Sequence, residues 1–75
     1  VTTMAQKDKK ILKLEKMLEH WADHNESHKK SFLKWRDIAE VKGLLSVAGK
    51  LDEAVEFMDK CTAKLLSAHQ ELKEE

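Results

Sequence analysis

Three of the four histidines in this 75-residue chain recur at every fourth position, at His20, His24 and His28. Because residues i and i+4 are neighbours on a helix surface, a helix would stack these imidazoles along one face. Imidazole binds transition metals and changes its charge near neutral pH. The stripe is therefore a set of metal ligands, a pH-sensitive contact surface, or a chance pattern on a polar helix.

The fourth histidine and the single cysteine lie in the second half of the chain, at His69 and Cys61. If the chain turns back between residues 44 and 45, residues on the two antiparallel helices whose numbers add up to about 89 are neighbours. This places His69 opposite His20 and Cys61 opposite His28. His20, His24 and His69 would then supply three imidazoles, and His28 with Cys61 an imidazole and a thiolate. Both sets suit zinc, nickel, cobalt or copper.

A purely structural interpretation competes with the metal site. Asn25 and Thr62 also fall at positions that are otherwise apolar, and a buried polar layer often fixes the register and oligomeric state of a helical bundle without any metal. The His-Glu-x-x-His signature of zinc enzymes is absent, and so is the Glu-x-x-His motif of di-iron bundles. We expect no catalytic residues and no enzyme, and both the metal site and the structural layer stay open.

The elements that carry these residues are two helices. The chain has no proline, two glycines and 37% charged residues, which favours long uninterrupted helices over sheets. Apolar spacings of three and four run from Ile11 to Ala39, and Gly43 is typical of a helix C-terminus with a left-handed backbone. We call the contact surface between the two helices the seam. On the first helix its expected residues are Ile11, Leu14, Leu18, Trp21, Asn25, His28, Phe32, Trp35 and Ala39. On the second helix they are Val47, Leu51, Ala54 or Val55, Met58, Cys61 or Thr62, Leu65, Ala68 and Leu72.

Capping residues set the expected bounds of these helices. Thr3 and Gln6 fit a capping box, and Ser46 fits the N-cap of the second helix. We predict an all-α fold with one helical-hairpin domain over residues 1–75: a helix over about 4–42, a turn over 43–46 and a helix over about 47–73.

Large apolar side chains exceed what one hairpin can bury. We therefore expect a homo-oligomer, a dimer of hairpins forming a four-helix bundle, or docking on a protein partner. Trp and Met are also common in protein interfaces. The expected interface residues are Met17, Trp21, Phe32, Trp35 and Phe57.

The charge balance argues against other partners. Fourteen basic and fourteen acidic residues give a net charge of zero, so no overall field attracts nucleic acid or anionic lipid. No apolar run approaches the roughly 20 residues of a membrane span. A single cysteine fits a reducing compartment. We expect a cytoplasmic protein that binds neither nucleic acid nor membrane.

The run His20-Trp21-x-x-His24-Asn25-x-x-His28 resembles a family of short, uncharacterised prokaryotic proteins with an H-W-x-x-H-N-x-x-H helix. The resemblance covers about residues 11–72 and implies that this pattern is a family trait, with no established activity to transfer. The leading hypothesis is a small metal-binding or metal-responsive accessory protein. The competing one is a structural interaction module that oligomerises.

Overall fold

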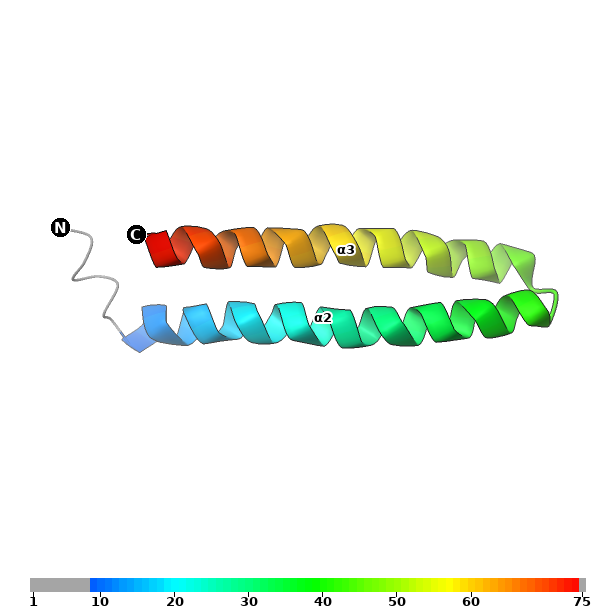
Figure 1. Ribbon diagram of the computed structural model, residues 1–75, viewed down its shortest axis with the longest axis horizontal. Helices are drawn as coiled ribbons and strands as arrows, with labels where there is room; N and C mark the ends of the chain where they lie inside the picture. The colour runs from blue at the N-terminus through cyan, green and yellow to red at the C-terminus, as the bar shows by residue number, and fades with distance from the viewer. Residues whose placement is uncertain (1–8, 75) are drawn as a thin grey trace.

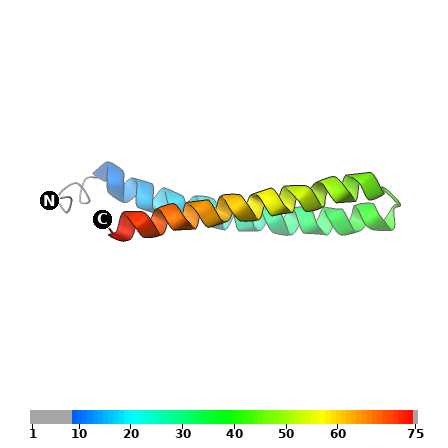
Figure 2. The ribbon, with the colours of Figure 1, turned by 90° about the horizontal axis from the view of Figure 1, so that it is seen from above.

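Two long antiparallel helices make up the fold. The computed structural model describes residues 9–74, which form α2 (Lys9–Val41) and α3 (Leu45–Glu74). The helices lie side by side in Figure 1, and seen from above α3 crosses in front of α2 (Figure 2). The predicted all-α hairpin is confirmed. α3 begins earlier than predicted, so Ser46 lies within its first turn and does not precede it. The predicted capping box at Thr3 and Gln6 lies outside the described residues.

A tight turn joins the helices at the predicted glycine. Gly43 has a φ of 80°, the left-handed region that favours glycine. The Leu44 N–H donates to the Ala39 carbonyl at 2.8 Å and the Gly43 N–H to the Glu40 carbonyl at 3.0 Å. These two bonds define a Schellman motif, which satisfies carbonyls left free at the end of α2.

Two ion pairs across the hairpin report its register. Lys29 Nζ lies 2.8 Å from Asp59 Oδ1, and Arg36 Nη1 lies 2.6 Å from Asp52 Oδ1. Both pairs have residue numbers that add up to 88, one less than the sum of about 89 that the sequence predicts. The hydrogen bond to Asp59 raises the pKa of Lys29, and bonds first to Asp52 and then to Asp37 raise the pKa of Arg36. Because the basic groups are solvated, the pairs specify register more than they stabilise the fold.

The seam on α2 differs from the predicted one at every second position. Leu14, Trp21, His28 and Trp35 were predicted to face α3 and are exposed. The residues after them take those places, so the seam is more polar than predicted. The α2 residues in the seam are Ile11, Glu15, Leu18, Ala22, Asn25, Lys29, Phe32, Arg36 and Ala39.

Side-chain size and charge explain this choice. α3 brings large apolar groups such as Leu51, Met58 and Leu65 into the seam, so small residues on α2 allow the helices to approach closely. Lys29 and Arg36 cover apolar surface with their stems while their charged ends reach acidic residues of α3. The predicted Val47 and Ala68 are exposed, and of the alternatives Cys61 and Thr62 it is Thr62 that lies in the seam. On α3 the seam residues are Ala48, Leu51, Val55, Met58, Thr62, Leu65, His69 and Leu72.

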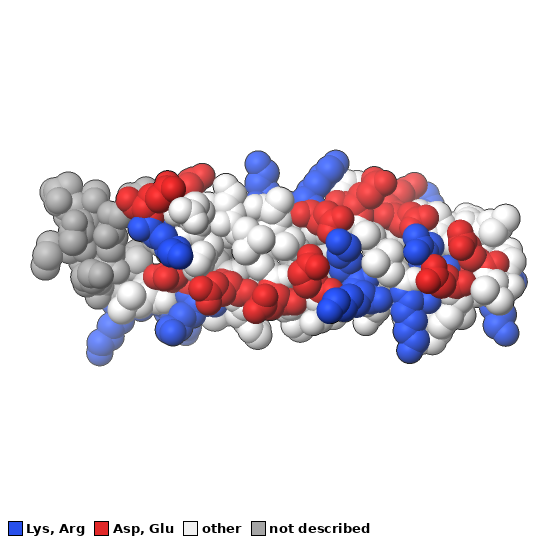
Figure 3. Space-filling model, viewed as in Figure 1, with Lys and Arg blue, Asp and Glu red and all other residues white. Residues whose placement is uncertain are grey.

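The core inside the hairpin is thin. Within residues 9–74 no large side chain is fully buried, and the buried apolar residues are Leu18 and three alanines, at 22, 39 and 48. The Cα radius of gyration is 17.1 Å, against about 11 Å for a compact chain of this length. On the face drawn in Figure 3, acidic and basic side chains of both signs run along the two helices. One hairpin therefore buries little apolar surface against itself.

The two glycines give a matched pair of stability predictions. Gly43→Ala should lower the free energy of unfolding by about 1–2 kcal/mol, because an L-residue is strained in the left-handed region. Gly49→Ala should raise it by about 0.5–1 kcal/mol, since Gly49 lies inside α3. An added Cβ meets nothing within 4 Å at either site, so packing does not enter. Urea denaturation followed by circular dichroism at one protein concentration measures both, and equal effects of the two substitutions would contradict the turn geometry.

Candidate functional site

The predicted histidine stripe forms a column of rings on the surface of α2. The rings of His20 and His24 stack with centroids 5.9 Å apart, and those of His24 and His28 meet edge to face at 4.4 Å. His28 stacks in turn on Phe32 at 6.2 Å. All three histidines are exposed, so the column faces away from α3 and is open to a ligand or a partner.

His24 and His28 converge more closely than ring stacking requires. Their Nε2 atoms lie 2.8 Å apart. Two neutral imidazoles can make this contact either as one N–H···N hydrogen bond or by directing both lone pairs at one cation. Metal–nitrogen distances of about 2.0–2.1 Å place adjacent ligands about 2.9 Å apart at a right angle and about 3.3 Å apart in a tetrahedron. The pair therefore has nearly the spacing of two neighbouring metal ligands.

His69 lies in the seam, away from this pair. Its side chain is 12% exposed, and its Nε2 lies 3.1 Å from Glu19 Oε2, an ion-pair distance without hydrogen-bond geometry. The predicted triad of His20, His24 and His69 is thus divided between the outer surface and the seam. Within residues 9–74 no group of three or more His, Cys, Asp or Glu side chains is placed to hold a metal ion. Metal binding stays a prediction.

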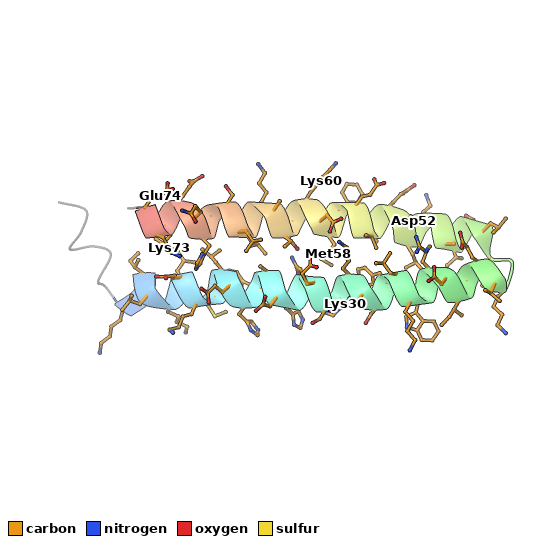
Figure 4. All side chains as sticks on the ribbon, in the orientation of Figure 1. Lys30, Asp52, Met58, Lys60, Lys73 and Glu74 are labelled. Atoms are coloured by element: carbon orange, nitrogen blue, oxygen red, sulfur yellow. The ribbon has the colours of Figure 1, made fainter. Side chains whose placement is uncertain are left out.

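The polar residues Asn25, Cys61 and Thr62 meet halfway along the hairpin. Asn25 Nδ2 donates to the Cys61 Sγ at 3.4 Å, which links α2 to α3. Thr62 is buried in the seam, and its Oγ1 has no hydrogen-bond partner among the described residues. Cys61 itself is exposed. At this level one weak hydrogen bond joins the helices. The buried hydroxyl of Thr62 makes no hydrogen bond that would offset the cost of its burial. Figure 4 shows Met58, close to this level, pointing from α3 toward α2.

An uncharged row of residues follows the outside of α2 at alternating spacings of three and four. Trp21 and Trp35 dominate it, with exposed fractions of 41% and 57%. The opposite flank of the hairpin carries the ion pairs of Asp52 and Asp59. We call this row the outer stripe; its members are Leu14, Met17, Trp21, His24, His28, Ser31, Trp35 and Ile38.

The other predicted interface residues divide between surface and seam. Phe57 is exposed on α3, where the Nζ of Lys60 lies 5.8 Å from its ring centroid. Met17 and Phe32 are half-buried. At its C-terminal end the outer stripe meets a shallow apolar depression lined by Asp37, Ile38, Val41 and Lys42.

Sequence reasoning singled out six of the eight members of the outer stripe, all except Ser31 and Ile38, but assigned four of the six to the seam. Two candidate rows on α2 share Ile11, Leu18, Asn25, Phe32 and Ala39, so apolar spacing cannot separate them. The distinguishing signal was charge: only one row places basic residues opposite the acids that recur seven residues apart on α3, at 52 and 59.

Comparison with known proteins identifies a family whose function is not known. The model of a family described as a domain of unknown function, DUF8180, matches residues 14–72. No curated protein and no solved structure matches the chain. Neither described helix has a segment long and apolar enough to cross a bilayer.

The unpaired hydroxyl of Thr62 gives a test of the polar layer. Thr62→Val keeps the shape and removes a buried group without a partner, so it should raise the free energy of unfolding by about 1 kcal/mol. Thr62→Ser keeps the hydroxyl and removes the methyl, so it should lower it by about 1 kcal/mol. Thermal and urea denaturation measure both. A destabilised Val variant would mean that the hydroxyl has a stabilising partner in the folded protein.

Proposed function

The chain belongs to the DUF8180 family, a domain of unknown function, and we propose from its surface that it acts by binding, as a self-association module in which two hairpins form a four-helix bundle. The observation that supports this proposal is the outer stripe, in which all members but the half-buried Met17 and Ile38 are exposed. The stripe has two tryptophans and no Asp, Glu, Lys or Arg, and it lies beside a thin core. Exposed apolar rows of this kind mark protein interfaces.

The outer stripe is complementary to itself in antiparallel orientation. Its spacings read the same in both directions, so a twofold axis at its midpoint pairs residues whose numbers add up to 52, as 14 and 38 do. Leu14 then meets the second copy's Ile38, next to the apolar depression, and Met17 meets the second copy's Trp35. Trp21 meets the small Ser31. Each tryptophan of the stripe thus opposes a small or a flexible residue.

The exposed area of the chain is consistent with such a dimer. The hairpin exposes 5956 Å², about a quarter more than the roughly 4,700 Å² expected for a compact monomer of its mass. The difference, about 1,200 Å² per chain, exceeds the roughly 800 Å² that each partner contributes to a standard interface. A second copy is therefore a suitable occupant of the stripe, since it also supplies the missing half of the core.

A second function is favoured by the His24–His28 contact: a small accessory protein that binds zinc, nickel or cobalt. We further propose that the H-W-x-x-H-N-x-x-H helix is a trait shared with short prokaryotic proteins. We also propose that the protein is not an enzyme and that the protein works in the cytoplasm. The sole cysteine of the chain, free in the structure, fits that compartment.

Removal of the two tryptophans should abolish self-association. The double variant Trp21→Gln with Trp35→Gln should raise the dimer dissociation constant by at least about 100-fold, because buried tryptophans dominate interface energies. Glutamine supports a helix, so circular dichroism should still report folded helices in concentrated samples. Leu66→Gln is the matched control: Leu66 is 51% exposed but lies on the other flank, and its substitution should leave the dissociation constant unchanged. Sedimentation equilibrium measures all three proteins, and a monomeric wild type at millimolar concentration would refute the proposal.

Cysteine cross-linking tests the orientation. In a Cys61→Ser background, a mixture of Leu14→Cys and Ile38→Cys chains should form mixed disulfides on oxidation, because these positions face each other across the axis. Leu14→Cys alone should form none, since two copies of residue 14 would lie about 36 Å apart along the helices. Efficient disulfides between Leu14→Cys chains would instead indicate a parallel pairing.

A further inference from the structure

The His24–His28 pair lies at the midpoint of the outer stripe. Between the ends of the stripe at Leu14 and Ile38, the two histidines are equally distant from the middle. In the antiparallel pairing, His24 therefore meets the second copy's His28, and His28 meets the second copy's His24. Measured along the helices, the two copies of His24 are offset by only about 6 Å.

We propose that two copies of this chain build one transition-metal site on their twofold axis, with His24 and His28 of each copy as its four nitrogen ligands. The site takes a divalent ion that prefers imidazole, such as zinc, nickel or cobalt. This inference rests on the self-association proposed above, and it makes the metal a clamp between hairpins.

The geometry within one chain supplies half of such a site. The two Nε2 atoms are 2.8 Å apart on exposed side chains, so both can turn toward a shared ion. No group of three or more potential ligands occurs within residues 9–74, so one chain alone leaves the coordination incomplete. Four nitrogen ligands, two from each copy, complete the number that zinc usually takes.

The remaining candidate ligands already have other neighbours. His69 Nε2 lies 3.1 Å from Glu19 Oε2 inside the seam, and Cys61 Sγ accepts a hydrogen bond from Asn25. His20 belongs to the same ring column but lies one turn beyond His24, nearly two turns from the midpoint, where the twofold axis would bring it to the level of Phe32. His20 is therefore the natural comparison residue for the site.

The experiment combines calorimetry with sedimentation on the untagged full chain. Zinc, nickel and cobalt chlorides are titrated separately, and the dissociation constant of the dimer is measured in EDTA and in each metal. We expect one ion per two chains and a dimer tightened on the order of tenfold or more by metal. His28→Gln should abolish both effects, while His20→Gln should retain both.

The outcomes separate this inference from the proposed function. A dimer in EDTA that binds none of the three ions more tightly than about 100 μM overturns the metal site and leaves self-association intact. A monomer in EDTA that binds one ion per chain overturns both. Retained binding in His28→Gln together with lost binding in His20→Gln overturns the assignment to this pair.

Discussion

The two ion pairs between the helices decide which side of α2 is buried. Lys29 and Arg36 reach Asp59 and Asp52 only if positions 29 and 36 face α3. Successive residues on a helix are rotated by about 100°, so the preceding positions, 28 and 35, are then turned out of the seam. The exposure of the tryptophans and of the histidine column follows from this single choice of helix face. A solvated ion pair adds little to the stability of a fold. Here the charges nevertheless determine which of two rows of similar apolar character on α2 faces α3.

A consequence of that choice is a core that is small for the length of the helices. Alanines at 22 and 39 on α2 and at 48 on α3 allow close approach but bury few atoms. The two tryptophans of α2 remain outside the seam, where α3 does not cover them. If two hairpins associate through the outer stripe as proposed, folding and association are coupled, because the second layer of the core would then lie between the hairpins. The histidine pair belongs to the same uncovered surface, so a metal ion and a second copy would act on one equilibrium.

Much of the fold could be predicted from the sequence because its signals are local. Gly43 marks the turn through the conformational freedom of glycine, and the position of the turn gives the register to within one residue. Apolar spacing alone could not identify the seam, because it is compatible with two rows, and the charges that distinguish the rows act between the helices. For the same reason the contact of His69 with Glu19 was missed, although the clustering of His20, His24 and His28 needed only the helix itself.

Because of the location of both tryptophans, fluorescence and circular dichroism respond to different features of the structure. The chain has no tyrosine, so Trp21 and Trp35 account for nearly all of its near-ultraviolet emission, and both lie on the outer stripe. Indole emission responds to the loss of water around the ring, whereas far-ultraviolet dichroism responds to the backbone helices. In the proposed dimer, fluorescence would report quaternary structure and dichroism would report secondary structure. Coincident transitions of the two signals would therefore mean that assembly and helix formation are one cooperative event.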